Sequence, residues 1–216
     1  MQTRRPWLRR ASVTAVSAAA LVAMAAPADA AAPADAAAPA GAATAVTTAA
    51  AADVDYATWQ RDCQAVMDQA LPYLKQRIAA AKPGEKQAIV LDIDNTALET
   101  DFGFSYPQPA NKPVLEAARY AQERGVALFF VTARPDIIHS FTEYNLKQAG
   151  YQVSGLYVRN FIDLFKNVAE YKTAQRVDVE KKGYTIIANI GNSATDLSGG
   201  HAEKTYKLPD YDGQLS

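Results

Sequence analysis

The sequence predicts an α/β fold, in which one mostly parallel sheet is covered by helices on both faces. Short apolar runs, typical of buried strands, recur along the chain. Segments with helical periodicity lie between them, and glycine or proline stands at many of the boundaries. Because strands that alternate with helices indicate βαβ units, neighbouring strands are expected to run parallel.

Residues 1–30 are predicted to be an export signal outside the fold. Pairs of arginines precede an apolar, acid-free run at 11–26, and a small-x-small cleavage pattern follows at 28–30. The arginines also resemble a twin-arginine signal, so the twin-arginine and general secretory routes both stay open. The apolar run is largely alanine and too short for a permanent span, so no stable membrane span is expected in the mature protein.

Residues 31–52 are almost all alanine, proline, glycine and threonine, which predicts a flexible tether. The folded domain is therefore expected over residues 53–216. The formal net charge of the chain is −1, so nothing indicates a nucleic-acid partner. Cys63 is the single cysteine, which excludes an internal disulfide, and we interpret it as a small buried residue on a helix.

The domain is expected to begin with a helix over residues 56–69 that is capped by Asp55. Pro72 is expected to kink this helix or to start a second one that ends near residue 81. The further predicted helices cover 113–125, 135–150 and 167–181, and the predicted strands cover 88–91, 126–131, 155–158, 185–190 and, at the sheet edge, 204–208.

Two acids follow the buried strand over 88–91, and they are the most informative pair in the sequence. Successive side chains of a strand alternate between its faces, so Asp92 and Asp94 are expected to project the same way. Two carboxylates in one small volume favour a hard divalent cation with oxygen ligands, which predicts a Mg²⁺ site. The alternative is an Asx-rich turn after a buried strand.

Polar residues also follow two other predicted strands. Thr132 comes after the strand over 126–131, and Asn192 and Asp196 come after the strand over 185–190. If these strands are parallel neighbours, their carboxyl ends lie at one edge of the sheet, where ligands bind in open α/β folds.

The loop over residues 97–111 contains the aromatic residues Phe102, Phe104 and Tyr106. Aromatic side chains beside a charged site can form a platform on which a substrate stacks. They can equally serve ordinary packing, and both interpretations stay open.

In these motifs the chain resembles the acid phosphatases of the HAD (haloacid dehalogenase-like) superfamily, in the class B/C-like branch of secreted and surface bacterial phosphatases related to plant vegetative storage proteins. The matching motifs are Asp92-Ile93-Asp94-Asn95-Thr96, Thr132-Ala133-Arg134, Tyr171-Lys172-Thr173-Ala174-Gln175-Arg176, and Gly191 to Asp196. The resemblance implies a Rossmann-like HAD fold with N-terminal helices and a small cap-like loop. It also implies Mg²⁺-dependent hydrolysis of a small-molecule phosphomonoester.

The resemblance implies a role for each motif. Asp92 is the implied nucleophile that forms an aspartyl-phosphate, and Asp94 the implied general acid and base. Thr132 is expected to bind phosphoryl oxygens, and Lys172 to neutralise charge on Asp92 and the phosphate. Arg134 is expected to bind phosphate or a carboxylate.

The metal ligands implied by the resemblance come from the first and fourth motifs, namely Asp92, the main chain of Asp94, Asn192 and Asp196. Asn192 stands where the family usually carries an aspartate, so one negative charge leaves the metal shell and a weaker Mg²⁺ site is expected. Asp196 is alternatively expected to orient Lys172. Lys166 is the alternative to Lys172. A non-catalytic phosphate- or ligand-binding or storage protein on the same scaffold is the alternative function.

Overall fold

The computed structural model describes residues 54–103 and 105–215, which belong to a single compact unit. The predicted export signal, the predicted tether and Phe104 lie outside the described residues. None of the helices over 54–103 and 105–215 is both long enough and apolar enough to cross a membrane.

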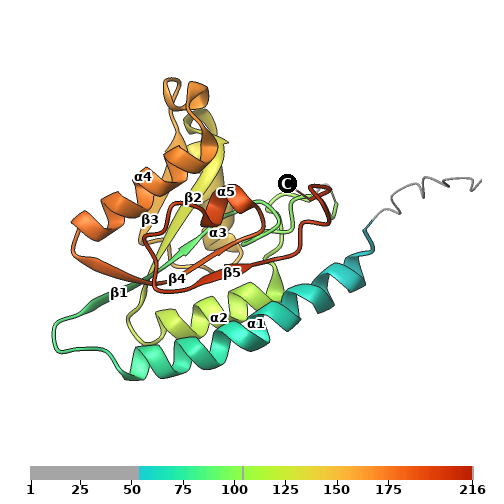
Figure 1. The fold of residues 1–216 in the computed structure, drawn as a ribbon. Coiled ribbons are helices and arrows are strands. Elements are labelled where there is room, and N and C mark those ends of the chain that lie inside the picture. The colour runs from blue at the N-terminus through green and yellow to red at the C-terminus, as the bar shows by residue number, and fades with distance from the viewer. Residues whose placement is uncertain (1–53, 104, 216) are drawn as a thin grey trace, which may run out of the picture. The chain divides into compact units, whose positions relative to one another are not determined.

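A five-stranded parallel sheet with strand order β3-β2-β1-β4-β5 forms the centre of the unit, which confirms the predicted α/β class (Figure 1). The helices and strands in chain order are α1 (Tyr56–Ala79), β1 (Lys86–Leu91), α2 (Lys112–Gln122), β2 (Ala127–Pro135), the 3₁₀ turn η1 (Asp136–Ile138), α3 (His139–Gln148), β3 (Gly155–Arg159), the 3₁₀ turn η2 (Asp163–Phe165), α4 (Val168–Lys181), β4 (Tyr184–Gly191), α5 (Ala194–Leu197) and β5 (Thr205–Lys207).

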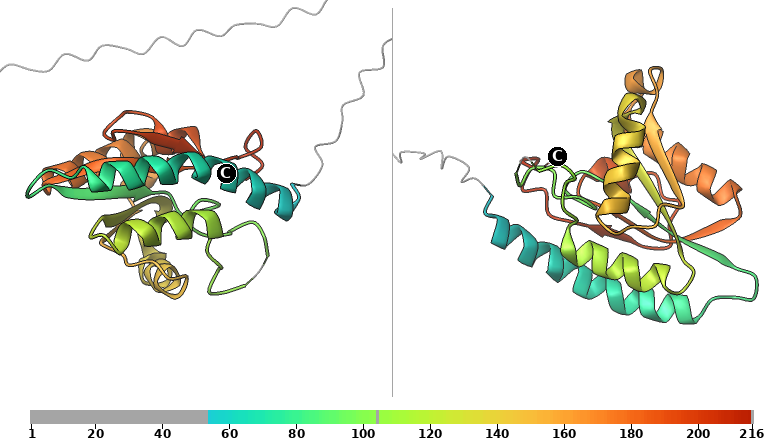
Figure 2. Two further views of the ribbon diagram at one scale, coloured as in Figure 1. Left: turned by 90° about the horizontal axis from the view of Figure 1, so that it is seen from below. Right: turned by 180° about the vertical axis from the view of Figure 1, so that it is seen from behind.

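Helices cover both faces of this sheet because its central strands are apolar on both sides. In β1, Ile89 and Leu91 pack into the core beneath α1 and α2, which lie side by side along one face (Figures 1 and 2). Ala88 and Val90 alternate with them and pack on the opposite face with Tyr171 of α4. The strand alternation predicted for the apolar run is therefore observed up to Leu91.

Helix α1 begins as predicted, because the Asp55 carboxylate accepts a hydrogen bond from the Thr58 main-chain nitrogen at 2.9 Å. The alternative that Pro72 starts a second helix was wrong, since α1 continues unbroken to Ala79. Ala70 and Leu74 are both completely buried on either side of the proline. This apolar packing offsets the hydrogen bond that proline cannot donate.

Strand β2 is longer than predicted. It does not end at Val131 but runs to Pro135, which pairs with Arg159 at the far end of β3 after a register shift. The following helix α3 consequently begins at His139, after a 3₁₀ turn, and not at Pro135. Thr132 and Arg134 are thereby held on a strand rather than on a loop.

The other predicted elements are confirmed with small differences at their ends. Asn167 caps α4 through its side-chain oxygen, and β5 lies at the sheet edge beside β4. Cys63 is completely buried on α1, as interpreted from the sequence.

Candidate active site

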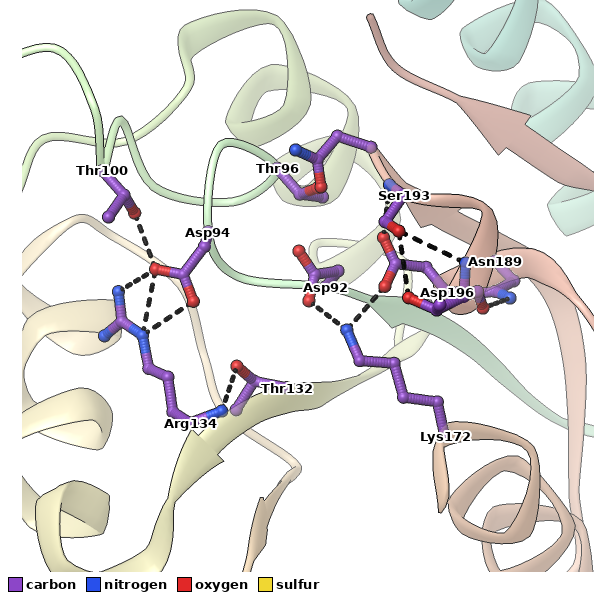
Figure 3. A network of polar contacts seen from close by, with 12 residues as sticks. Asp92, Asp94, Thr96, Thr100, Thr132, Arg134, Lys172, Asn189, Ser193 and Asp196 are labelled. Carbon is purple, nitrogen blue, oxygen red and sulfur yellow. Dashed lines mark hydrogen bonds and ion pairs between the residues drawn. The ribbon is translucent and has the colours of Figure 1, made fainter. Parts of the chain in front are cut away.

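The polar residues after β1, within β2 and after β4 converge at one end of the sheet, as predicted from the order of the motifs (Figure 3). These strands are neighbours in the sheet, and their carboxyl ends share one edge. The buried polar side chains gathered there include Asp92, Thr132, Lys172, Asn192 and Asp196.

The centre of the site is a lysine between two carboxylates (Figure 3). Lys172 Nζ lies 2.6 Å from Asp92 Oδ1 and 2.5 Å from Asp196 Oδ1, and all three side chains are at least nine-tenths buried. One ammonium faces two carboxylates, so the cluster has one uncompensated negative charge when both acids are ionised.

The pKa shifts agree with this charge count. Burial raises the pKa of Asp92 to about 6, although Lys172 opposes the shift. Burial alone would lower the pKa of Lys172, but the attraction of Asp92 and Asp196 outweighs it and raises that pKa above its ordinary value. At neutral pH the lysine is therefore charged, and the Asp92 carboxylate is available as a nucleophile or ligand.

Asp196 is held by the start of the short helix α5. Its Oδ2 accepts a hydrogen bond from the Ser193 nitrogen at 2.8 Å, while the Ser193 side chain caps the same turn. Gly191 precedes this turn, and a Cβ at that position would lie only 2.4 Å from the Asp196 Cβ. Both Asp196 oxygens thus have partners, and its geometry suits a residue that orients Lys172.

Asp94 has a separate cationic partner. Arg134 Nη2 lies 2.6 Å from Asp94 Oδ1, and its Nε donates to Asp94 Oδ2 at 3.0 Å (Figure 3). Thr100 Oγ1 donates to Asp94 Oδ1 at 2.9 Å, and Arg134 also donates to Gln108 Oε1 at 3.0 Å. Two ligands were expected for Arg134, phosphate or a carboxylate. The structure shows the carboxylate, which is that of Asp94.

The expectation that strand alternation orients both acids was wrong, because β1 ends at Leu91 and Asp94 lies in the following turn. Among the described side chains, Asp92 and Asp94 have different cationic partners. Asp92 pairs with Lys172, whereas Asp94 pairs with Arg134 and is more exposed, with 37% of its side chain accessible against 7% for Asp92.

No group of three or more His, Cys, Asp and Glu side chains suited to a metal ion occurs within residues 54–103 and 105–215. The oxygen donors nonetheless fit a hard divalent cation. Asp92 Oδ2 has no hydrogen-bond donor within the described part of the chain, the Asn192 side chain supplies a neutral amide oxygen, and the buried cluster needs one more positive charge. Asp92, Asn192 and main-chain oxygen are the donors that fit it.

The aromatic residues expected at the substrate separate into two groups. Phe102 stacks on Trp59 with a distance of 4.4 Å between the ring centroids, and it packs against the core. Of the two interpretations, substrate platform or packing, packing therefore applies to Phe102. Tyr106 is 56% exposed, and its hydroxyl donates to the Phe141 carbonyl oxygen at 3.0 Å.

Tyr106 and Phe141 border an open hollow of about 510 Å³, which we call the aromatic hollow. Among the residues that the structure describes, its lining is Ser105, Tyr106, Gln108, Arg134, Ile138, Phe141 and Thr142. Because Arg134 also contacts Asp94, the hollow opens directly beside the charged site. Phe141 was missed in the sequence because it lies in a predicted helix and not in the aromatic loop.

Arg176 is another residue whose role the sequence did not reveal, although it stands one helical turn after Lys172. It is completely buried, and it donates hydrogen bonds to the main-chain oxygens of Asp196 at 2.7 Å and Gly200 at 2.8 Å. The i, i+4 spacing was the available signal. Lys166, the alternative to Lys172, is half exposed and pairs with Asp163.

Comparison with known proteins gives the same family as the motifs. The profile described as "HAD superfamily, subfamily IIIB (Acid phosphatase)" matches residues 9–108 and 105–214, which is nearly the whole chain. Among solved structures, a class C acid phosphatase from Bacillus anthracis superposes with a TM-score of 0.54 and 17% identity over 67% of either chain. At this identity the superposition shows the fold alone.

Curated relatives include plant proteins. The chain is 37% identical over 89 residues to the stem 28 kDa glycoprotein of Glycine max, covering 39% of this chain and 35% of the relative. It is 28% identical over 128 residues to a stem 31 kDa glycoprotein of Glycine max, covering 58% of this chain and 50% of the relative. The chain thus matches at most about half the length of these relatives. By its profile match, which carries all four motifs, the chain belongs to subfamily IIIB of the HAD superfamily, the acid phosphatases.

Proposed function

We propose that the protein is a Mg²⁺-dependent phosphomonoesterase that acts through an aspartyl-phosphate on Asp92. The observation that carries this proposal is the placement of Lys172 between Asp92 and Asp196, beside a second acid, Asp94, that has its own arginine. Enzymes separate the roles of two acids by giving them different environments, and here the two environments differ in burial and in cation.

In the first half-reaction, Asp92 Oδ2 attacks the phosphorus atom and the bond from phosphorus to the ester oxygen breaks. Protonated Asp94 gives its proton to the departing oxygen, so an alcohol leaves and Asp94 becomes a carboxylate. Lys172 stays on Asp92 Oδ1 and balances charge next to the phosphoryl group. Thr132, which is completely buried on β2, would donate a hydrogen bond to the phosphoryl group.

In the second half-reaction, the Asp94 carboxylate accepts a proton from water as that water attacks phosphorus. The acyl-phosphate bond to Asp92 breaks, inorganic phosphate leaves, and both aspartates regain their starting states. When bound, Mg²⁺ supplies positive charge that stabilises the transferring phosphoryl group. Asp92, Asn192 and the main chain of Asp94 would hold it.

Arg134 gives this site a substrate-binding group. In the structure its guanidinium donates hydrogen bonds to Asp94. The phosphoryl oxygens of an entering substrate compete for the same planar donors, which frees Asp94 to take up a proton and turn toward the leaving group. The organic part of the substrate then enters the aromatic hollow.

We also propose that the protein is exported, through the signal over residues 1–30 and a tether over 31–52. The composition of these residues and the similarity to plant stem glycoproteins support export. The second candidate function, a phosphate- or ligand-binding or storage protein, is favoured by one observation: Asn192 removes a negative charge from the metal shell.

Turnover of p-nitrophenyl phosphate separates the two functions. We expect the purified chain to release p-nitrophenol when Mg²⁺ is added and to stop when Mg²⁺ is chelated. Asp92→Asn, nearly isosteric with the native residue, should lower the rate by about 10⁴-fold or more while phosphate still binds. Phosphate binding without turnover at any Mg²⁺ concentration would identify the binding protein instead.

A further inference from the structure

One main-chain oxygen connects the loop after β1 with the loop after β4, and these two loops carry the proposed metal ligands. The carbonyl oxygen of Leu215 accepts a hydrogen bond from Asn95 Nδ2 at 3.2 Å and another from Asn192 Nδ2. Asn95 directly follows Asp94, and Asn192 directly follows β4. A carbonyl oxygen has two lone pairs, so both are used by buried amides of the site.

The segment that supplies this carbonyl, which we call the 210–215 turn, is fixed to the domain. Leu215 is only 5% exposed and belongs to the core, and its nitrogen donates to the Asp210 carbonyl oxygen at 3.1 Å. The Tyr211 hydroxyl donates to Asp62 Oδ2 of α1 at 2.8 Å. The turn is therefore an ordered part of the wall behind Asn192.

The Leu215 carbonyl determines how the Asn192 amide is oriented. A carbonyl oxygen only accepts hydrogen bonds, so the Asn192 atom that faces Leu215 must be the NH₂ group. Its Oδ1 is consequently turned the other way, where the Thr96 hydroxyl donates to it at 3.3 Å. The amide oxygen thus faces Thr96, the last residue of the motif that also contains Asp92 and Asp94.

The same contact explains why position 192 is an asparagine. An aspartate there would bring a carboxylate oxygen against the Leu215 carbonyl, with no proton between two acceptors. Two buried acceptors in contact are unfavourable, so the aspartate would either push the 210–215 turn away or lose its own orientation.

We propose that the 210–215 turn is a positioning element, which holds the Asn192 amide oxygen toward the metal and thereby makes asparagine, not aspartate, the fitting ligand in this chain. The proposal rests on the proposed metal-dependent function. It extends that function to a segment that touches neither the phosphoryl group nor Asp92, and that acts only through Asn192 and Asn95.

A double-mutant cycle on Mg²⁺ affinity tests this, with binding measured calorimetrically and without substrate. One axis is Asn192→Asp and the other is deletion of residues 209–216. In the Asn192 background, deletion should weaken Mg²⁺ binding, because nothing then orients the amide. In the chain that lacks residues 209–216, Asn192→Asp should strengthen Mg²⁺ binding. The factor by which it raises the Mg²⁺ affinity should be at least about tenfold larger there than in the full chain.

The matched control makes the same chemical change at an exposed position. Asn167→Asp leaves a side-chain oxygen to cap α4 and should change Mg²⁺ affinity in neither chain. A merely structural turn would lower the melting temperature without coupling to position 192. Equal effects of Asn192→Asp on Mg²⁺ affinity in both chains would overturn the proposal.

Hydrogen exchange keeps the proposal testable if the deleted chain does not fold. In the full chain, Asn192→Asp should speed amide exchange within residues 210–215 by more than Asn192→Ala, because only the aspartate repels the Leu215 carbonyl. Equal exchange in the two variants would contradict it. Because neither experiment uses turnover, a catalytically silent protein that still binds Mg²⁺ would count against the proposed function and not against this inference.

Discussion

Arg134 holds the Asp94 carboxylate with two parallel hydrogen bonds, from Nη2 to Oδ1 at 2.6 Å and from Nε to Oδ2 at 3.0 Å. This pair is what distinguishes Asp94 from Asp92, which lies two residues earlier and pairs with a buried lysine. In the proposed mechanism, the phosphoryl group takes over Arg134 and thereby releases Asp94 for proton transfer to the leaving group.

Arg134→Met should lower kcat/KM by about 10- to 100-fold, because it removes a charge-assisted contact to the phosphoryl oxygens. Most of the loss is expected in KM. Steady-state kinetics with p-nitrophenyl phosphate measures both parameters. Arg124→Met, which changes an exposed arginine in the turn after α2, is the control and should have wild-type kinetics. A loss confined to kcat would show that Arg134 serves Asp94 and not the substrate.

Asp196→Asn should lower kcat because the neutral amide no longer fixes Lys172 beside Asp92. Lys172→Met should lower kcat by about 100-fold or more, since it removes the positive charge next to the phosphoryl group. The effects of the two changes should be far from additive in the double variant, because Asp196 acts through Lys172. Additive losses in kcat would give Asp196 an independent role, such as direct metal binding.

The two aromatic groups should respond differently to truncation. Phe141→Ala should raise KM for aryl phosphates by about threefold to tenfold while leaving KM for a small alkyl phosphate unchanged, because it removes a wall of the aromatic hollow.

Phe102→Ala is the matched comparison. It should leave the ratio of the two KM values unchanged and instead lower the free energy of unfolding by about 2 kcal/mol, because it removes the ring that stacks on Trp59. A uniform rise of KM in Phe141→Ala would mean that this side chain only supports the fold.

The stability of the fold at acidic pH should depend on Arg77. This residue of α1 pairs with Glu85, just before β1, and with Glu203, just before β5. Hydrogen bonds from Arg77 lower the pKa of Glu85 from its usual 4.5 to about 2. A carboxylate with a lowered pKa stabilises the fold above pH 4.5, and this contribution disappears as the pH falls toward 2.

Arg77→Met removes that contribution at every pH. Its melting temperature should therefore be lower than that of the wild type at neutral pH, and the difference should shrink as the pH falls toward 2. A difference in melting temperature that stays constant with pH would show that Arg77 acts through packing alone.

The sequence predicted the parts of the structure that depend on local patterns. The apolar run before Asp92, the glycines after helices and the order of strands and helices were sufficient for the parallel sheet and for the edge at which the site lies. The motifs also favoured Lys172 over Lys166, and in the structure Lys172 pairs with Asp92 whereas Lys166 pairs with Asp163.

What the sequence did not predict depends on contacts between distant residues. Pro72 stays inside α1 because buried neighbours hold the helix, and Phe102 faces Trp59 and not the site. The Leu215 carbonyl has no side-chain signature at all, so its hydrogen bond to Asn192 is visible only once the chain is folded.

The central claim is that phosphate is transferred to Asp92, and acid quenching during turnover tests it most directly. The chain is mixed with a phosphomonoester and Mg²⁺, quenched in acid, digested and analysed by mass spectrometry. We expect phosphate on the peptide that contains Asp92, and none in Asp92→Asn. Hydrolysis at the full rate without a phosphorylated peptide, or with phosphate on any other residue, would contradict the account.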